Sequence, residues 1–186
     1  VGNLFNVGFG LMVMLLAICL GALYMINNIA HQALTLQLRR RLGQCFALFV
    51  PILLIELIAL FTMDGFAVDE AGIVSMQAGK YLHNLLQMPV VAAMFDIGAI
   101  LLLLGILLTL LKKQFNKGIW LAAPGTVLVV ISFFLIAGYN NTAYYPSTAD
   151  IQSSLTLSNS CSSEFTLRAM AIVSLIIPFV VAYIAY

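Results

Sequence analysis

Residues 146–186 read PSTADIQSSLTLSNSCSSEFTLRAMAIVSLIIPFVVAYIAY, a polar segment followed by an apolar run that continues to the last residue. Between residues 165 and 186 the only charged side chain is Arg168. A helix rises about 1.5 Å per residue, so about 20 apolar residues cross the roughly 30 Å of hydrocarbon in a bilayer. The pattern therefore predicts a transmembrane helix over residues 165–186, preceded by a polar loop.

The composition of the whole chain places it in the same environment. Hydrophobic residues make up 63% of the sequence and charged residues 8%, and the mean hydropathy is +1.09. Soluble domains carry roughly 25% charged residues, so the sequence indicates an integral membrane protein. The net charge is +1, and the chain has no long basic block of the kind that binds nucleic acid. Nucleic acid is therefore not an expected partner.

Five apolar stretches are long enough to span a bilayer. They cover residues 7–34, 45–63, 89–111, 118–138 and 165–186. None alternates apolar and polar residues with a period of two, as a strand of a membrane barrel would. We therefore predict an all-α polytopic integral membrane protein, with five transmembrane helices in one bundle and a single domain over residues 1–186. The chain begins with Val1 and has no signal-peptide pattern, so we interpret it as part of a longer polypeptide.

The distribution of basic residues predicts the orientation of these helices. Six of the eight Lys and Arg residues lie between the first and second or the third and fourth predicted helices: Arg39, Arg40, Arg41, Lys112, Lys113 and Lys117. The other two, Lys80 and Arg168, belong to the opposite side. Short loops rich in Lys and Arg remain in the cytoplasm. We therefore predict that these two connections are cytoplasmic, the N-terminus of the chain lies outside, and the C-terminus lies in the cytoplasm.

Several short motifs occur in the order and spacing of a known family. Near the C-terminus they are Pro146-Ser147-Thr148, Ser154-Leu155-Thr156, Asn159, Ser162-Ser163, Thr166-Leu167, Met170, Pro178 and Tyr183. Gly2-Asn3-Leu4-Phe5 and Met63-Asp64-Gly65-Phe66 agree more loosely. On these motifs the chain resembles subunit II of cytochrome bd-type quinol oxidases, in particular its C-terminal five-helix portion.

The resemblance implies a non-haem subunit of a membrane quinol:oxygen oxidoreductase, part of the electron transport of a bacterial respiratory chain. It implies that haems b and d are carried by a haem-bearing subunit I and that quinol is the substrate of the complex. The expected partners are subunit I, small accessory single-helix subunits, and membrane lipid or quinone. The expected role is to support assembly and the access of oxygen and protons to subunit I, in the bacterial inner membrane.

Two ionisable residues lie within the predicted spans, Glu56 and Asp96. Such residues are costly in a bilayer and usually face protein or water. Ala92, Ala93 and Ala99 lie three or four residues from Asp96, and small side chains allow a second helix to approach closely. We therefore predict that Asp96 points into the bundle, while the neighbours of Glu56 leave its direction open. Either carboxyl belongs to a proton route or a contact with another subunit, or it is a hydrogen-bonded structural residue.

The two histidines are the first residues to consider as haem ligands. His31 falls in the last turns of the first predicted helix and His83 in the loop before the third, so the two lie at opposite surfaces and cannot share one iron. We interpret both as interface or loop histidines. The three cysteines have no metal-ligand spacing, and the sequence contains no phosphate-binding loop and no nucleophile paired with a base. We therefore expect no catalytic, cofactor-binding or metal site on this chain.

The alternative function is part of a secondary transporter or a small channel, with Glu56 and Asp96 coupling to an ion. Many transporters contain internal repeats and interrupted membrane helices. Neither feature is evident in this sequence. Without the resemblance the residues do not separate the two functions, and with it we favour the oxidase subunit.

Overall fold

The computed structural model describes residues 3–69, 71–112, 114–147 and 149–185. Within these residues five helices are long and apolar enough to cross a membrane. They are α1 (Leu4–Asn28), α2 (Gln32–Thr62), α4 (Pro89–Leu111), α5 (Ile119–Gly138) and α7 (Glu164–Ala185). The structure is 75% helical, which confirms the prediction of an all-α polytopic membrane protein.

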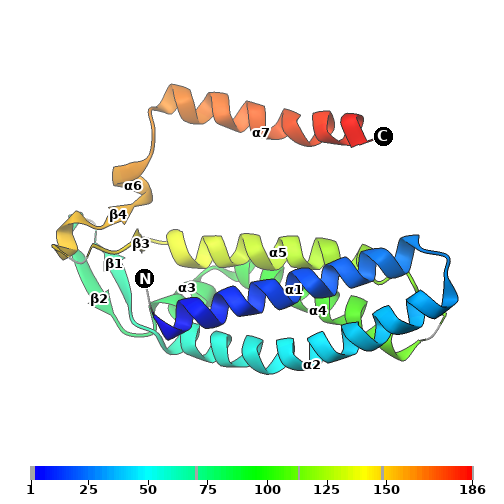
Figure 1. Ribbon diagram of the computed structural model, residues 1–186. Helices are drawn as coiled ribbons and strands as arrows, with labels where there is room; N and C mark the ends of the chain where they lie inside the picture. Colours follow the sequence, from blue (N-terminus) through cyan, green and yellow to red (C-terminus); the bar gives the residue numbers. More distant parts are fainter. Residues whose placement is uncertain (1–2, 70, 113, 148, 186) are drawn as a thin grey trace.

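Four of the five long helices pack together, and α7 stands apart from them. Figure 1 shows α1, α2, α4 and α5 side by side, whereas α7 runs at a distance beyond α5. Every side chain at residues 164–184 is exposed. Within this chain, four of the five predicted spans therefore contact one another, and α7 lies apart from them. Hydropathy predicts that a helix spans a membrane, but a helix that is apolar all round gives no indication of its neighbours.

The boundary between the first two helices also differs from the prediction. α1 ends at Asn28, and α2 begins at Gln32 after a turn in which the His31 Nδ1 accepts a hydrogen bond from the backbone N–H of Leu34 (3.3 Å). His31 is thus the N-cap of α2 and not part of the first helix. The apolar residues Ile29 and Ala30 continue the hydropathy signal across this turn, which explains why the sequence places the end of the helix too late.

Arg39, Arg40 and Arg41 lie within α2 and not in a connecting loop. Arginine is a good helix former, so these charges end the apolar run without ending the helix. The 31 residues of α2 span about 46 Å at 1.5 Å per residue, more than the roughly 30 Å of hydrocarbon. The N-terminal part of α2 therefore extends beyond the bilayer, and Arg39 lies at the same end of the bundle as the connection between α4 and α5.

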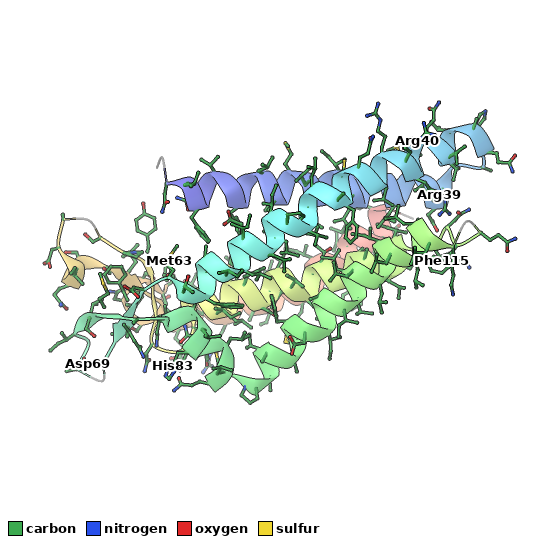
Figure 2. All side chains as sticks on the ribbon, turned by 90° about the horizontal axis from the view of Figure 1, so that it is seen from below. Arg39, Arg40, Met63, Asp69, His83 and Phe115 are labelled. Carbon is green, nitrogen blue, oxygen red and sulfur yellow. The ribbon has the colours of Figure 1, made fainter. Side chains whose placement is uncertain are left out.

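Arg39 fixes this end of α2 to the connection between α4 and α5. Its guanidinium donates hydrogen bonds to the backbone oxygen of Lys112 (3.3 Å), the backbone oxygen of Phe115 (2.9 Å) and the Oδ1 of Asn116 (2.7 Å). The bond to Lys112 places a positive charge at the C-terminus of α4, where it interacts favourably with the helix dipole. Figure 2 shows Arg39, Arg40 and Phe115 at one end of the bundle and Met63, Asp69 and His83 at the other.

The end of the bundle remote from Arg39 carries two small hairpins that the sequence analysis did not predict. β1 (Gly65–Val68) pairs antiparallel with β2 (Val74–Gln77), and β3 (Ala143–Tyr145) pairs antiparallel with β4 (Leu155–Thr156). An Ala67–Thr142 bridge joins the two hairpins. The short helices α3 (Lys80–Gln87), η1 (Ile151–Ser153) and α6 (Leu157–Ser160) complete this end. The connection between α2 and α4 and the connection between α5 and α7 therefore lie at the same end of the bundle, as predicted.

Small residues allow α4 and α5 to touch along their backbones. A Cβ atom at Gly98 would lie 2.9 Å from the Gly125 carbonyl oxygen, and one at Gly105 would lie 2.8 Å from the Ala122 nitrogen. Both distances are shorter than normal contacts, so these positions require glycine. Close approach over small residues is a common way for helices to associate in membranes. The face of α4 that bears Gly98 and Gly105 is consequently covered by α5.

Candidate functional site

Glu56 lies in the seam between α1 and α2. The buried residues of α2 are Leu42, Phe49 and Glu56, which follow one another at intervals of seven residues and so share one side of the helix. They face α1, where Met12 and Leu15 pack against Phe49 in one apolar cluster. The Glu56 side chain is 8% exposed. A carboxyl group therefore occupies a position at which the rest of the seam has apolar side chains.

The opposite helix leaves room for this carboxyl by having no side chain there. A Cβ atom at Gly8 of α1 would overlap the Oε1 of Glu56. The other oxygen, Oε2, is buried and has no hydrogen-bond partner within the described residues. A buried polar atom without a partner costs about 1–3 kcal/mol, so this orientation of Glu56 calls for an explanation. Among the described residues, this is the one buried side-chain oxygen or nitrogen without a hydrogen-bond partner.

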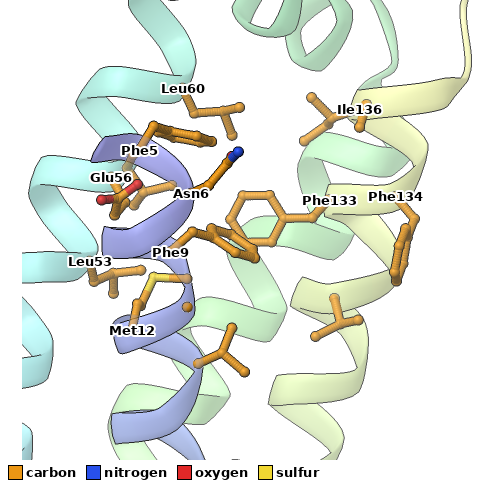
Figure 3. A pocket seen from close by; sticks show the side chains of 15 residues that line it. Phe5, Asn6, Phe9, Met12, Leu53, Glu56, Leu60, Phe133, Phe134 and Ile136 are labelled. Carbon is orange, nitrogen blue, oxygen red and sulfur yellow. The ribbon is translucent and has the colours of Figure 1, made fainter. Parts of the chain in front are cut away.

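Glu56 also lines a cavity of about 660 Å³ between α1, α2 and α5. Figure 3 shows the lining side chains from these three helices. Apart from Glu56 and Asn6, all of them are apolar or glycine. One lining residue, Phe134, is 75% exposed, so part of the lining belongs to the outer surface of the helical bundle. The site is therefore an apolar chamber with one ionisable group in its wall.

Phe9 and Phe133 in the chamber wall belong to a row of aromatic contacts that continues behind the wall to α4 and α2. The ring of Phe133 on α5 makes edge contacts with Phe9 on α1 (centroids 6.3 Å apart) and with Phe95 on α4 (5.5 Å). Phe95 in turn contacts Phe61 on α2 (6.5 Å). Aromatic pairs in this geometry stabilise packing by about 0.5–1.5 kcal/mol each. The chamber wall therefore has a defined shape.

Asp96 is not part of this site. The structure places it on the exposed side of α4, away from the α4–α5 contact, so the prediction that it points into the bundle is wrong for this chain. Its side chain has no hydrogen-bond or ion-pair partner in the described part of the chain. The alanines near Asp96 are small enough to admit another helix, but the four packed helices of this chain do not provide one. Of the two predicted carboxyl residues, only Glu56 is buried.

A polar cluster at the end of the bundle remote from Arg39 is centred on Asn84, which is fully buried. Its Nδ2 donates to the backbone oxygen of Ile136 and to the Thr142 Oγ1, both at 2.8 Å, and its Oδ1 accepts from the Asn140 Nδ2 at 3.1 Å. The Nζ of Lys80 donates to the backbone oxygen of Asn140 (3.1 Å), and burial lowers the pKa of this ammonium below its ordinary value. The cluster joins α3 to the end of α5 and is structural.

The two histidines lie at opposite ends of the helical bundle. His31 caps α2 near Arg39, whereas His83 lies in α3 at the opposite end, and not in a loop as predicted. Within the described residues, no three His, Cys, Asp or Glu side chains lie close enough together to hold a metal ion. The residues of this chain therefore do not fit a haem ligated by two of its own histidines.

Comparison with known families identifies what these helices belong to. The family described as cytochrome bd terminal oxidase subunit II matches residues 1–186, the whole sequence. The chain belongs to this family. No curated protein matched the chain. As a member of the cytochrome bd subunit II family, it is a multi-pass membrane protein and a subunit of a terminal oxidase complex, with a partner oxidase subunit.

For this oxidase subunit, sequence reasoning missed Gly8 and the aromatic chamber. A signal was available for the seam between α1 and α2. The interval of seven residues between Leu42, Phe49 and Glu56 places the carboxyl on the buried side of α2. The matching residues of α1 follow intervals of three and four, which bring Gly8 to the same seam. The contact between Phe95 and Phe133 had no such signal, because it depends on how α4 packs on α5.

Proposed function

We propose that this chain is the non-haem subunit of a quinol:oxygen oxidoreductase, in which a partner subunit carries haems b and d. Membership of the cytochrome bd subunit II family supports this function over the transporter or channel alternative. We place the complex in the bacterial inner membrane, with the Arg39 end of the bundle in the cytoplasm. In this proposal the chain binds no redox centre. It supports the assembly of the complex and the access of oxygen and protons to the haem-bearing subunit.

The single observation that carries the proposal beyond the family is the Glu56 carboxyl in the wall of an apolar chamber. Its Oε2 has no partner among the described residues, and a carboxyl group can both take up and release a proton. Ionisable residues inside membranes commonly belong to proton relays. We assign to Glu56 the transfer of protons toward the haem-bearing subunit, through a partner group at Oε2.

The chamber itself suits the access of oxygen. Its wall is apolar except for Glu56 and Asn6, and apolar cavities in proteins remain dry and bind apolar molecules. Oxygen is a small apolar molecule that partitions into the bilayer. We therefore assign to this chamber the entry of oxygen from the membrane.

Purification of the complex from cells, followed by its visible absorption spectrum, tests this function. The tagged chain should co-purify with a partner that gives b-type and d-type haem bands. When this chain is deleted, the assembled complex and those bands should be lost. A tagged chain that inserts in the membrane but co-purifies without any haem protein would refute the proposal.

A further inference from the structure

The exposed side of α4 combines apolar residues with an unpaired carboxyl. We call this surface the Asp96 face; it consists of Ala93, Asp96, Ile97, Ile100, Leu104 and Leu107. At about 100° per residue these side chains lie within roughly 100° of one another around the helix. The residues of α4 that contact α5, such as Gly98 and Gly105, lie about 180–200° from Asp96. The two faces are therefore distinct.

The depth of Asp96 places it within the hydrocarbon region. It follows the first residue of α4, Pro89, by seven positions and precedes the last, Leu111, by fifteen, which correspond to about 10 Å and 22 Å along the axis. Ile97 and Ile100 beside it are 53% and 56% exposed. Ionisable residues at such depth almost always pair with another group inside protein. Lipid alone is thus a poor environment for this face.

We propose that the Asp96 face docks a transmembrane helix of the partner oxidase subunit, and that this helix presents a hydrogen-bond donor to the Asp96 carboxyl. The inference rests on the proposed function, because it names the surface through which the two subunits meet. Ala92, Ala93 and Ala99 flank the carboxyl and allow the backbone of a second helix to approach closely. A donor side chain from that helix supplies what Asp96 lacks.

The fifth long helix of this chain, α7, is a less suitable partner for the Asp96 face. Its one cation within the described residues, Arg168, already forms an ion pair with Glu164 one turn earlier on α7. The hydroxyl of Ser174 on α7 donates to the backbone oxygen of Ala171 on its own helix. The donors of α7 that lie at comparable depth are therefore already used within α7.

Photocrosslinking in the purified complex tests the docking directly. The photoreactive residue p-benzoylphenylalanine replaces Ile100 on the Asp96 face or, as a control, Ile58 on α2. Ile58 is 64% exposed, and its neighbours Leu54, Ile55, Phe61 and Thr62 carry no charge. We expect Ile100 to give at least about fivefold more adduct with the haem-bearing subunit than Ile58 does, as a buried interface position should. Adducts with lipid, with α7, or with another part of the same polypeptide would overturn the inference.

Two substitutions test the carboxyl itself. Asp96→Asn keeps the shape and can still accept a hydrogen bond, so it should retain the yield of complex. Asp96→Leu leaves the partner's donor unsatisfied and should lower the yield by about fivefold or more, whereas the control Ile100→Leu should not. Equal yields for Asp96→Leu and Asp96→Asn would contradict the hydrogen bond. If no haem protein co-purifies with the unmodified chain, the proposed function fails; if one does but Ile100 does not crosslink to it, only this inference fails.

Discussion

Gly8 of α1 and Glu56 of α2 occupy the same position in the seam between their helices, and the carboxyl oxygen of Glu56 fills the space that a side chain at residue 8 would take. A larger residue at position 8 would force the carboxyl to move. A smaller apolar residue at position 56 would leave a void beside the chamber. The pair therefore determines both the packing of α1 on α2 and the presence of an ionisable group at this point.

Substitution of Gly8 tests this relationship. Gly8→Ala should destabilise the chain by about 1 kcal/mol, the lower end of the range for overpacking, because the added methyl group displaces the flexible end of the Glu56 side chain. Gly10→Ala is the matched control, since a Cβ atom there would have no neighbour within 4 Å. It should be neutral or stabilising by up to about 1 kcal/mol through helix propensity. The midpoint of thermal unfolding in detergent is the measurement.

A double substitution separates the contact from a general effect on α1. Combining Gly8→Ala with Glu56→Ala removes the overlap, so the loss caused by Gly8→Ala should be largely absent in the Glu56→Ala background. Strictly additive effects of the two changes would show that Gly8 and Glu56 do not interact.

Asn84 should be the most sensitive polar residue of the end remote from Arg39. Its buried amide satisfies the Ile136 backbone oxygen, and Asn84→Leu leaves that acceptor and its neighbours without partners. We expect a loss of at least about 1–3 kcal/mol in the free energy of unfolding. Asn28→Leu is the control, because that side chain is exposed and donates to Tyr24 in its own helix. A similar loss in both variants would contradict a special role for the cluster.

Labelling in intact cells tests the orientation. With Cys161 removed, a cysteine introduced at Ser158 should react with a membrane-impermeant thiol reagent, because Ser158 is exposed and belongs to α6, beside the two hairpins (Figure 1). A cysteine that replaces Arg40, at the other end of the bundle, should react with the same reagent only after lysis. Reversal of the two patterns would place the arginines outside.

Replacing both His31 and His83 by Ala should leave the haem content of the assembled complex unchanged. His31 acts as a helix cap, and loss of such a cap costs about 0.5–2 kcal/mol, so some decrease in stability is expected without loss of haem. The ratio of haem absorbance to protein measures the outcome. Loss of one haem from a complex that still assembles would show that this chain supplies a ligand.

The transmembrane helices were predictable because their length and hydropathy are properties of the local sequence. The predicted span 89–111 coincides with α4, and 118–138 differs from α5 by one residue at its start. The contacts of α7 and the exposure of Asp96 were not predictable, because they depend on which helices are neighbours. Both α7 and α4 have apolar side chains on all sides, so their sequence patterns carry little information about which face another helix covers. The turn at residues 29–31 was missed because hydropathy does not change across it.

The sequence singles out Glu56 by its charge, but it does not predict which residues surround this side chain in the fold. Its immediate neighbours in the sequence, such as Leu53 and Leu60, are apolar on every side of the helix. Only the longer interval back to Phe49 and Leu42 indicates the buried side. The role of Gly8 then follows from the packing of α1, which no local pattern in α2 contains.

Oxygen consumption by the Glu56→Gln complex is the most direct test of the proton role of this site. Glutamine keeps the shape of the side chain but cannot release a proton. With unchanged haem content, the rate of quinol-dependent oxygen uptake should fall by about tenfold or more, equivalent to about 1.4 kcal/mol in the barrier. Asp96→Asn, which changes a carboxyl that we assign to a subunit contact, should keep most of the rate. A Glu56→Gln complex with normal haem bands and an undiminished rate would show that Glu56 carries no proton in the reaction.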